Sequence, residues 1–316
     1  MKYIIFLILF SLALSSCDME TVIDLEIPAH DPVLVLNGLL DTDTNVQVVV
    51  SHSVGAFSNA TPSFINNADV LLYKNDQPQP IASLLPDMTS LVYAYYMQSD
   101  YNIDSLPMYY YTSDYIPEKD ATYRVVVSHS EYDSISAVTF IPNDIILYNI
   151  NIDTTSNEDK IGLTFSFDDN ANEQNYYRLK LYASCKKEEY EKEDEWSKGY
   201  AEMMSNDPSF PSGIPWEGYT FRGNKVIFSD DLFNGQQKTI RLDVQSEFKY
   251  ASCDTVIIEF STFSDDTYSY YNSLGDHSDK GELGVFGGEV IPVYSNVQNG
   301  LGVLISTNAQ KIYLKP

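Results

Sequence analysis

Short runs in which apolar and polar residues alternate recur along most of this chain, and they constrain its fold more than any other feature. In "ATYRVVVSH" the apolar positions include Tyr123 and Val125, and in "KIGLTFSFDD" they include Leu163 and Phe165. Successive side chains of a strand point to opposite faces, so this alternation is typical of antiparallel strands with one buried face. We therefore predict a mainly-β fold.

The runs fall into two groups, separated by a polar turn after Pro142. The spacing of the turns favours β-sandwiches of immunoglobulin or fibronectin type, although the cysteine and tryptophan pattern of antibody domains is missing. We predict an N-terminal sandwich over residues 29–142 and a C-terminal β-rich, sandwich-like unit over residues 143–316.

The pattern changes inside the second unit. "KKEEYEKEDEWSKGYAEMMSNDP" places Glu and Lys at helix-compatible offsets, and the "PSFPSGIPWEG" that follows is rich in Pro and Gly. We predict an insertion of helix and loop at about 187–224. A short helix is predicted in "SDDTYSYYNSLGD", with Ser264 or Asp265 as its N-cap and Gly275 just past its end.

The first residues have the layout of a secretory signal peptide. Lys2 precedes the apolar run "YIIFLILFSLAL", which ends in Ser15 and Ser16. The run is too short to cross a bilayer, because a spanning helix needs about 20 residues. The segment "LSSC" that closes it resembles the lipobox of bacterial lipoproteins. That resemblance implies removal of residues 1–16, lipidation of Cys17 and a lipidated tether over residues 17–28.

The charge balance excludes one class of partner. The chain has 45 acidic and 19 basic residues, a formal net charge of −26, and no Lys/Arg cluster. Such a surface repels phosphate backbones and anionic membranes, so we predict no binding to nucleic acid and membrane attachment only through the lipid.

Apart from Cys17, the chain has two cysteines, Cys185 and Cys253. In an exported protein such a pair forms a disulfide or remains as two buried thiols, and sequence alone leaves both alternatives open.

Aromatic residues mark two candidate binding surfaces. The first is a tyrosine-rich stretch whose rings either pack across a sheet, the favoured interpretation, or form a binding surface. The second lies in the insertion, where two tryptophans line a ligand groove or pin the insertion to the sandwich, and pinning is again favoured. The residues are Tyr93, Tyr95, Tyr96, Tyr109, Tyr110 and Tyr111 in the first stretch and Trp196 and Trp216 in the second.

Catalytic motifs are not found in the sequence. It contains four histidines, His30, His52, His129 and His277, none within four residues of another. We therefore predict a binding protein rather than an enzyme, with no cofactor and no metal site. The acidic pairs Asp168/Asp169, Asp230/Asp231 and Asp265/Asp266 fit turns and helix caps better than Ca²⁺ ligands.

Several segments together resemble a known family. "CDMETVIDLEIPAHDPVLVLNGLL", "YRVVVSHSEYDSISAVTFIP", "FDDNANEQNYYRLKLY", "FSDDLFNGQQ", "FSDDTYSYYNSL" and "IPVYSNVQNGLGV" occur in the order expected for the Bacteroidota lipoprotein family catalogued as domain of unknown function number 4249. The likeness covers nearly the whole chain, and "YSNVQNGLG" is its most distinctive part. The family offers no established catalytic residues.

The resemblance implies a function. Members are commonly encoded beside TonB-dependent transporters, and Asp18, Glu20 and Asp24 resemble the acidic signal that sends such lipoproteins to the cell surface. We expect an outer-membrane, surface-facing lipoprotein that serves as accessory or substrate-capturing partner of a TonB-dependent transporter. The alternatives are a stand-alone surface module that binds a glycan, peptide or protein, and, as a third choice, a hydrolase.

Overall fold

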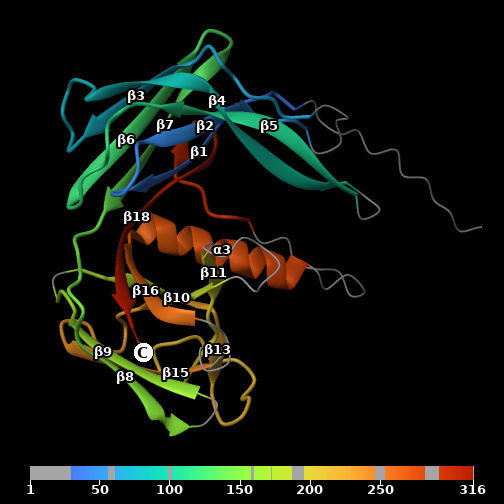
Figure 1. Ribbon diagram of the computed structural model, residues 1–316. Helices are drawn as coiled ribbons and strands as arrows, with labels where there is room; N and C mark the ends of the chain where they lie inside the picture. The colour runs from blue at the N-terminus through green and yellow to red at the C-terminus, as the bar shows by residue number, and fades with distance from the viewer. Residues whose placement is uncertain are drawn as a thin grey trace, which may run out of the picture. The chain divides into compact units, whose positions relative to one another are not determined.

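The structure, a computed structural model, describes residues 30–55, 61–98, 102–157, 160–171, 173–186, 196–245, 253–281 and 292–315 (Figure 1). Within these ranges the fold is mainly β, as the alternating runs predict. The strands form a 13-stranded sheet and a 5-stranded sheet. The described residues from Pro32 onward belong to one compact unit.

The strands before residue 142 form two layers. They are β1 (Leu34–Asp41), β2 (Gln47–His52), β3 (Asp69–Lys74), β4 (Ala82–Gln98), β5 (Asn102–Thr112), β6 (Ala121–His129) and β7 (Tyr132–Ile141). One layer has the order β1, β2, β5, β4 and the other the order β4, β3, β6, β7. β4 belongs to both because residues 82–84 pair with β3 whereas residues 85–98 pair mostly with β5.

The strands after residue 142 also form two layers. They are β8 (Tyr148–Asn157), β9 (Lys160–Asp168), β10 (Tyr176–Lys186), β11 (Trp196–Tyr200), β12 (Met203–Ser205), β13 (Phe221–Gly223), β14 (Lys225–Ser229), β15 (Gln237–Gln245), β16 (Cys253–Phe263), β17 (Val297–Gln298) and β18 (Leu301–Leu314). The 5-stranded sheet has the order β13, β12, β15, β9, β8, and β10, β14 and β16 belong to the larger sheet.

Buried apolar side chains form two clusters. The first takes its members from β1 to β7 and adds Leu304 of β18. The second takes its members from the 5-stranded sheet, from β10, β14 and β16 and from the segments between them, and it includes Phe167. The Phe167 ring lies 5.1 Å from both the Tyr177 and the Phe260 rings, in tilted contacts that aromatic pairs favour. Two cores therefore hold the chain together.

The last strand, β18, connects both cores (Figure 1). Its residues 301–307 pair in parallel with residues 35–41 of β1, and its residues 307–314 pair antiparallel with residues 256–263 of β16. The boundary predicted between residues 142 and 143 does not account for this strand. β17 and the first half of β18 come after the boundary in the sequence but pair with the N-terminal strands.

The distinctive segment "YSNVQNGLG" forms the entry to β18. The Asn296 side chain donates to the Val138 and Leu304 carbonyls, both at 2.8 Å, and accepts from the Leu304 N–H at 2.9 Å. Gly302 has a φ of 102°, and a Cβ there would collide with the Leu36 carbonyl. Only glycine combines this φ with so close an approach of two backbones. The motif therefore has a structural role.

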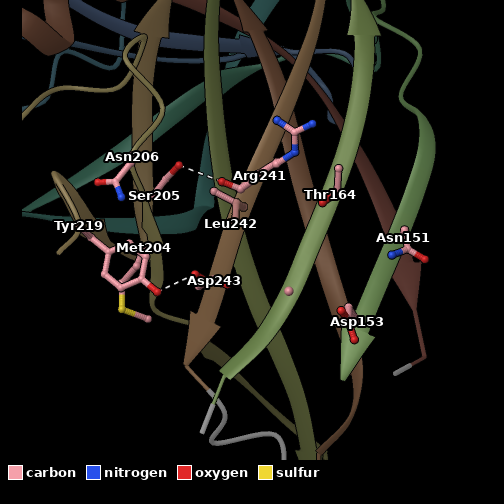
Figure 2. Close-up of a pocket in the computed structure, with 11 residues that line it drawn as sticks. Asn151, Asp153, Thr164, Met204, Ser205, Asn206, Tyr219, Arg241, Leu242 and Asp243 are labelled. Carbon is pink, nitrogen blue, oxygen red and sulfur yellow. Dashed lines mark hydrogen bonds between the residues drawn. The ribbon is translucent and has the colours of Figure 1, made fainter. Parts of the chain in front are cut away.

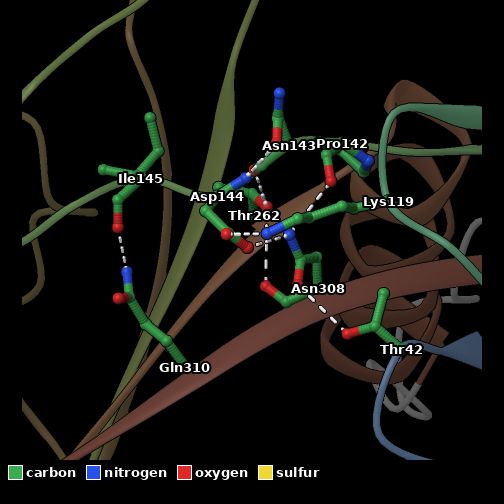
Figure 3. Close-up of polar contacts among 9 residues, drawn as sticks. All are labelled: Thr42, Lys119, Pro142, Asn143, Asp144, Ile145, Thr262, Asn308 and Gln310. Carbon is green, nitrogen blue, oxygen red and sulfur yellow. Dashed lines mark hydrogen bonds and ion pairs between the residues drawn. The ribbon is translucent and has the colours of Figure 1, made fainter.

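A cluster of polar contacts, here called the seam, ties the connection between β7 and β8 to β18 (Figure 3). The buried Asn308 amide donates to the Pro142 carbonyl and to Asp144 Oδ1, both at 3.0 Å, and its oxygen accepts from the Thr42 hydroxyl at 3.1 Å. Lys119 forms an ion pair with Asp144. The seam fixes the chain where it passes from one core to the other.

The helix α3 (Asp265–Gly281) begins where the sequence predicts but ends later. Ser264 is its N-cap, because its hydroxyl accepts from the Thr267 N–H at 3.2 Å. The prediction that Gly275 lies past the end is wrong, since the helix continues to Gly281. Gly275 is exposed, and one glycine inside a helix costs only about 1 kcal/mol relative to alanine, so it does not end the helix.

The predicted insertion contains strands where a helix was expected. Residues 187–195 lie outside the described ranges, but β11 pairs with residues 182–186 of β10, and β12 pairs with β13 and β15. β14 pairs with residues 176–180 of β10, next to β11 on the same edge. Backbone pairing makes residues 196–200 and 203–205 strands, whereas most of the Glu/Lys run lies at residues 187–195, outside the described ranges.

Among the described residues, no helix is both long enough and apolar enough to span a membrane.

Candidate functional site

The outer face of the 5-stranded sheet carries a line of polar residues. Leu163 and Leu242 are buried in the core, and their neighbours Thr164 and Arg241 point to the opposite side because side chains alternate along a strand. Thr164 lies opposite Asn151 of β8 and opposite Arg241 of β15. An amide, a hydroxyl and a guanidinium thus form one row across three strands (Figure 2).

A second row lies two residues along the same strands. Gly162 is opposite Asp153 on one side and Asp243 on the other. Because Gly162 has no side chain, the sheet is hollow between the two carboxylates. The two rows and Tyr219 line a groove of about 390 Å³, here called the Arg241 groove.

One wall of the groove is fixed by hydrogen bonds. The Tyr219 hydroxyl donates to Asp243 Oδ2 at 2.6 Å (Figure 2), and this bond raises the pKa of Tyr219. The Lys160 ammonium lies 4.6 Å from the centre of the Tyr219 ring and forms an ion pair with Glu217 at 3.2 Å. Tyr219 therefore presents a rigid edge to the groove.

A tight turn places Tyr219. Trp216 and Tyr219 exchange two backbone hydrogen bonds of 3.0 and 2.9 Å, and Glu217 and Gly218 between them have φ values of 51° and 85°. Positive φ at both central residues is typical of the turns that close β-hairpins. The Asn206 side chain holds the turn by donating to the Gly218 carbonyl at 2.9 Å.

Arg241 differs from most cations of the described chain. Arg222 binds Glu202 through two hydrogen bonds of 2.7 and 2.9 Å, and Lys238 binds Asp207 at 2.6 Å. Within the described ranges the Arg241 guanidinium has no hydrogen bond or ion pair, although the chain carries a net charge of −26. A guanidinium can bind a carboxylate through two parallel hydrogen bonds, so this side chain is available for a ligand.

The tyrosine-rich stretch predicted as a candidate surface lies on β4 and β5. The side chains of Tyr93, Tyr95 and Tyr96 lie outside the described part. Tyr109 and Tyr110 are half-buried, and the Tyr109 ring packs edge-on against Phe64 at 5.4 Å. These contacts agree with the alternative in which rings pack across a sheet.

Tyr111 corrects the surface interpretation. It is 0% exposed, its hydroxyl donates to the Ile65 carbonyl at 2.8 Å and accepts from the Ala68 N–H at 3.0 Å, and burial raises its pKa. A tyrosine with both hydrogen-bonding roles satisfied inside the core cannot contact a ligand, so Tyr111 is a core residue.

The remaining predicted positions have different outcomes. Trp216 is 57% exposed and begins the turn that places Tyr219 beside the groove, whereas the side chain of Trp196 is outside the described part.

Cys17 also lies outside the described residues, so its lipidation stays a prediction. The backbones of Cys185 and Cys253 are described and lie opposite each other in β10 and β16.

The acidic pairs serve the fold as hydrogen-bond acceptors. Asp169 accepts from the Gly235 N–H at 2.7 Å, and Asp230 accepts from the Asn175 N–H at 3.0 Å. Among the described residues no group of three or more His, Cys, Asp or Glu could hold a metal ion. The Arg241 groove has hydrogen-bond donors and acceptors with which it can bind a polar ligand.

Sequence reasoning missed the groove, although one local signal was present. In "KTIRLDVQ" Arg241 and Asp243 occupy the outward positions of an alternating strand, and Thr164 and Gly162 do so in "KIGLTFSF". The alignment of these positions depends on strand register, which the sequence does not reveal.

Comparison with known proteins identifies a family for nearly the whole chain. No curated protein matches the chain. A family model described as Domain of unknown function (DUF4249) matches residues 20–312. The chain therefore belongs to the DUF4249 family.

Proposed function

We propose that this protein is an outer-membrane lipoprotein, anchored through Cys17 and facing the cell surface, that captures a small polar ligand in the Arg241 groove as partner of a TonB-dependent transporter. Support for the anchor comes from the segment "LSSC" behind an apolar leader and from the acidic residues that follow it. Support for the transporter comes from the gene neighbourhood common in the family.

The observation that carries ligand capture is the row of unpaired polar groups on a concave surface. Asn151, Thr164 and Arg241 are in register, and none of these side chains has a hydrogen bond within the described ranges. Buried polar groups that support a fold are normally paired, as in the seam, whereas Asn151, Thr164 and Arg241 are exposed or half-buried and line the groove. A preformed hollow with a few convergent polar groups is typical of small-molecule sites.

The groove favours a ligand with a particular chemistry. In the first row, the Arg241 guanidinium and the Asn151 amide can donate hydrogen bonds to a ligand. In the second row, the Asp153 and Asp243 carboxylates can accept hydrogen bonds from it. Rows two residues apart along a strand are separated by about 7 Å. We therefore expect a ligand with a carboxylate or hydroxyl at one end and an amine or hydroxyl at the other, which describes short peptides and oligosaccharides.

Ligand binding is tested with the full chain in which Cys17→Ser removes the lipid. We expect calorimetry against a panel of di- and tripeptides and oligosaccharides to identify a binder. Arg241→Ala should weaken that binder at least tenfold. The matched control is Arg222→Ala, because Arg222 is paired with Glu202 outside the groove. A panel without any binder, or a binder unaffected by Arg241→Ala, contradicts the proposed site.

Partnership with a transporter is tested separately in native cells. Extraction in mild detergent should recover the wild-type protein together with a large outer-membrane barrel, and Cys17→Ala should release it from the membrane fraction. Recovery as a free monomer contradicts the partnership. Ligand binding in the groove without a barrel would then favour a stand-alone binding module.

A further inference from the structure

The register of β10 and β16 brings two distant cysteines together. Cys185 is near the end of β10 and Cys253 is the first residue of β16, 68 positions later in the sequence. The antiparallel ladder between these strands pairs Tyr176 with Phe263 at one end and Cys185 with Cys253 at the other. Besides Cys17, these are the only cysteines of the chain.

Such a placement satisfies the main geometric requirement of a disulfide. Residues directly opposite in an antiparallel pair have Cα atoms about 4.5 to 5.5 Å apart. Disulfides join residues whose Cα atoms are about 4.4 to 6.8 Å apart. The register also shifts between Ser184 and Cys185, so a bulge adjoins the pair and gives the backbone local freedom to adjust.

We propose that Cys185 and Cys253 form a disulfide across β10 and β16. The oxidant is a disulfide donor, such as a protein dithiol oxidase of the compartment outside the inner membrane. One cysteine thiolate attacks the donor disulfide, forms a mixed disulfide and releases one donor thiolate. The second cysteine thiolate attacks the mixed disulfide, forms the Cys185–Cys253 bond and releases the second donor thiolate. Two electrons and two protons thereby reduce the donor to a dithiol.

The bond would enclose part of the chain that lines the groove, whereas Asn151 of β8 and Thr164 of β9 lie outside the closed loop. Strands β11 to β15 lie between the two cysteines, together with Tyr219 and Arg241. Closing a loop of this length stabilises the fold mainly by restricting the unfolded chain. The disulfide therefore joins the two ends of the segment that carries Tyr219 and Arg241. Oxidation in the cell rests on the proposed export, whereas the pairing of the two cysteines rests on strand register alone.

The first test identifies the bond chemically. Protein purified without reductant from native cells is alkylated, digested with trypsin and analysed by mass spectrometry. We expect peptide 181–186 joined to peptide 250–280. In parallel, reduced full-length protein is exposed to oxidised glutathione under native conditions. If joined peptides are found only after treatment with oxidised glutathione, the pairing is supported and the proposed export is contradicted. Free alkylated Cys185 and Cys253 in both arms overturn the proposal.

The second test uses stability and a matched control. Cys185→Ser and Cys253→Ser should each lower Tm by about 5 °C or more, and the double variant should lower it no further. Reductant should lower the wild type to the same Tm and leave the variants unchanged. In the control, Ser184→Cys combined with Cys185→Ser moves the cysteine to the position paired with Thr255 instead of Cys253, so no joined peptide should form. Additive losses in the single variants, or a wild type unaffected by reductant, overturn the proposal.

Discussion

The seam and the Arg241 groove are both polar, but they use their polar groups in opposite ways. In the seam the Asn308 amide has partners for both its nitrogen and its oxygen, and Asp144 accepts from Asn308 while paired with Lys119. In the groove the row of Asn151, Thr164 and Arg241 has none within the described ranges. The comparison teaches that one cluster of polar residues is paired and stabilises β18, whereas the other is unpaired within the described ranges and remains available to a ligand. Substitutions at the two places should separate stability from binding.

The largest effect is expected at the start of β18. Gly302→Ala should lower the free energy of unfolding by about 3 kcal/mol or more, because the φ of 102° disfavours a side chain and the added Cβ collides with the Leu36 carbonyl. Urea unfolding measures the change. Gly275→Ala is the control, since nothing lies within 4 Å of a Cβ there and a helix interior gains about 0.5 to 1 kcal/mol from alanine. Equal effects at both glycines would contradict the special role of Gly302.

The next largest effect is expected at the centre of the seam. Asn308→Ala should lower the free energy of unfolding by about 2 to 3 kcal/mol, because it leaves the Pro142 carbonyl and the Thr42 hydroxyl without their partner. Thr42→Val removes one of these bonds and should cost less, about 1 kcal/mol. Urea unfolding of the two variants gives the order, and a larger loss in Thr42→Val would show that Asn308 is not the centre of the seam.

A smaller, pH-dependent effect is expected at Asp144. The hydrogen bond from Lys119 holds the pKa of the Asp144 carboxyl below its usual value of 3.8 in the folded state. A lowered pKa contributes stability above the unfolded-state value, and this contribution is lost as the pH falls through the folded-state value. The stability advantage of the wild type over Asp144→Asn should therefore shrink below about pH 4.

Unfolding curves between pH 3 and pH 7 test this expectation. Lys119→Met is the control, because removal of the ammonium should abolish most of the difference between Asp144 and Asn at position 144. An advantage that grows as the pH falls would reverse the sign and contradict the assignment.

The smallest effect on stability is expected in the groove. Arg241→Ala should change the free energy of unfolding by no more than about 0.5 kcal/mol, because the exposed guanidinium has no protein partner within the described ranges. The same variant should lose ligand binding. A large loss of stability would place Arg241 among the residues that support the fold.

Local patterns in the sequence predict the elements of this fold better than its assembly. The strands follow from alternation and the start of α3 follows from Ser264, because both depend on neighbouring residues. The strand β11 depends on its pairing with β10, which no local pattern records, and Gly275 misled the prediction because a glycine inside a helix is tolerated. The groove depends on the register of β8, β9 and β15, and no single segment records it.

The pairing of β18 with β1 also limits when this protein can fold. Leu36 is paired with Gly302, 266 positions later in the sequence, so β1 lacks this neighbour until the chain has been synthesised as far as β18. Contacts of such long sequence separation form slowly, because a large loop must close before they stabilise anything. The N-terminal strands are therefore synthesised before their final neighbour, and a chain cut before residue 301 leaves an edge of β1 open to other chains.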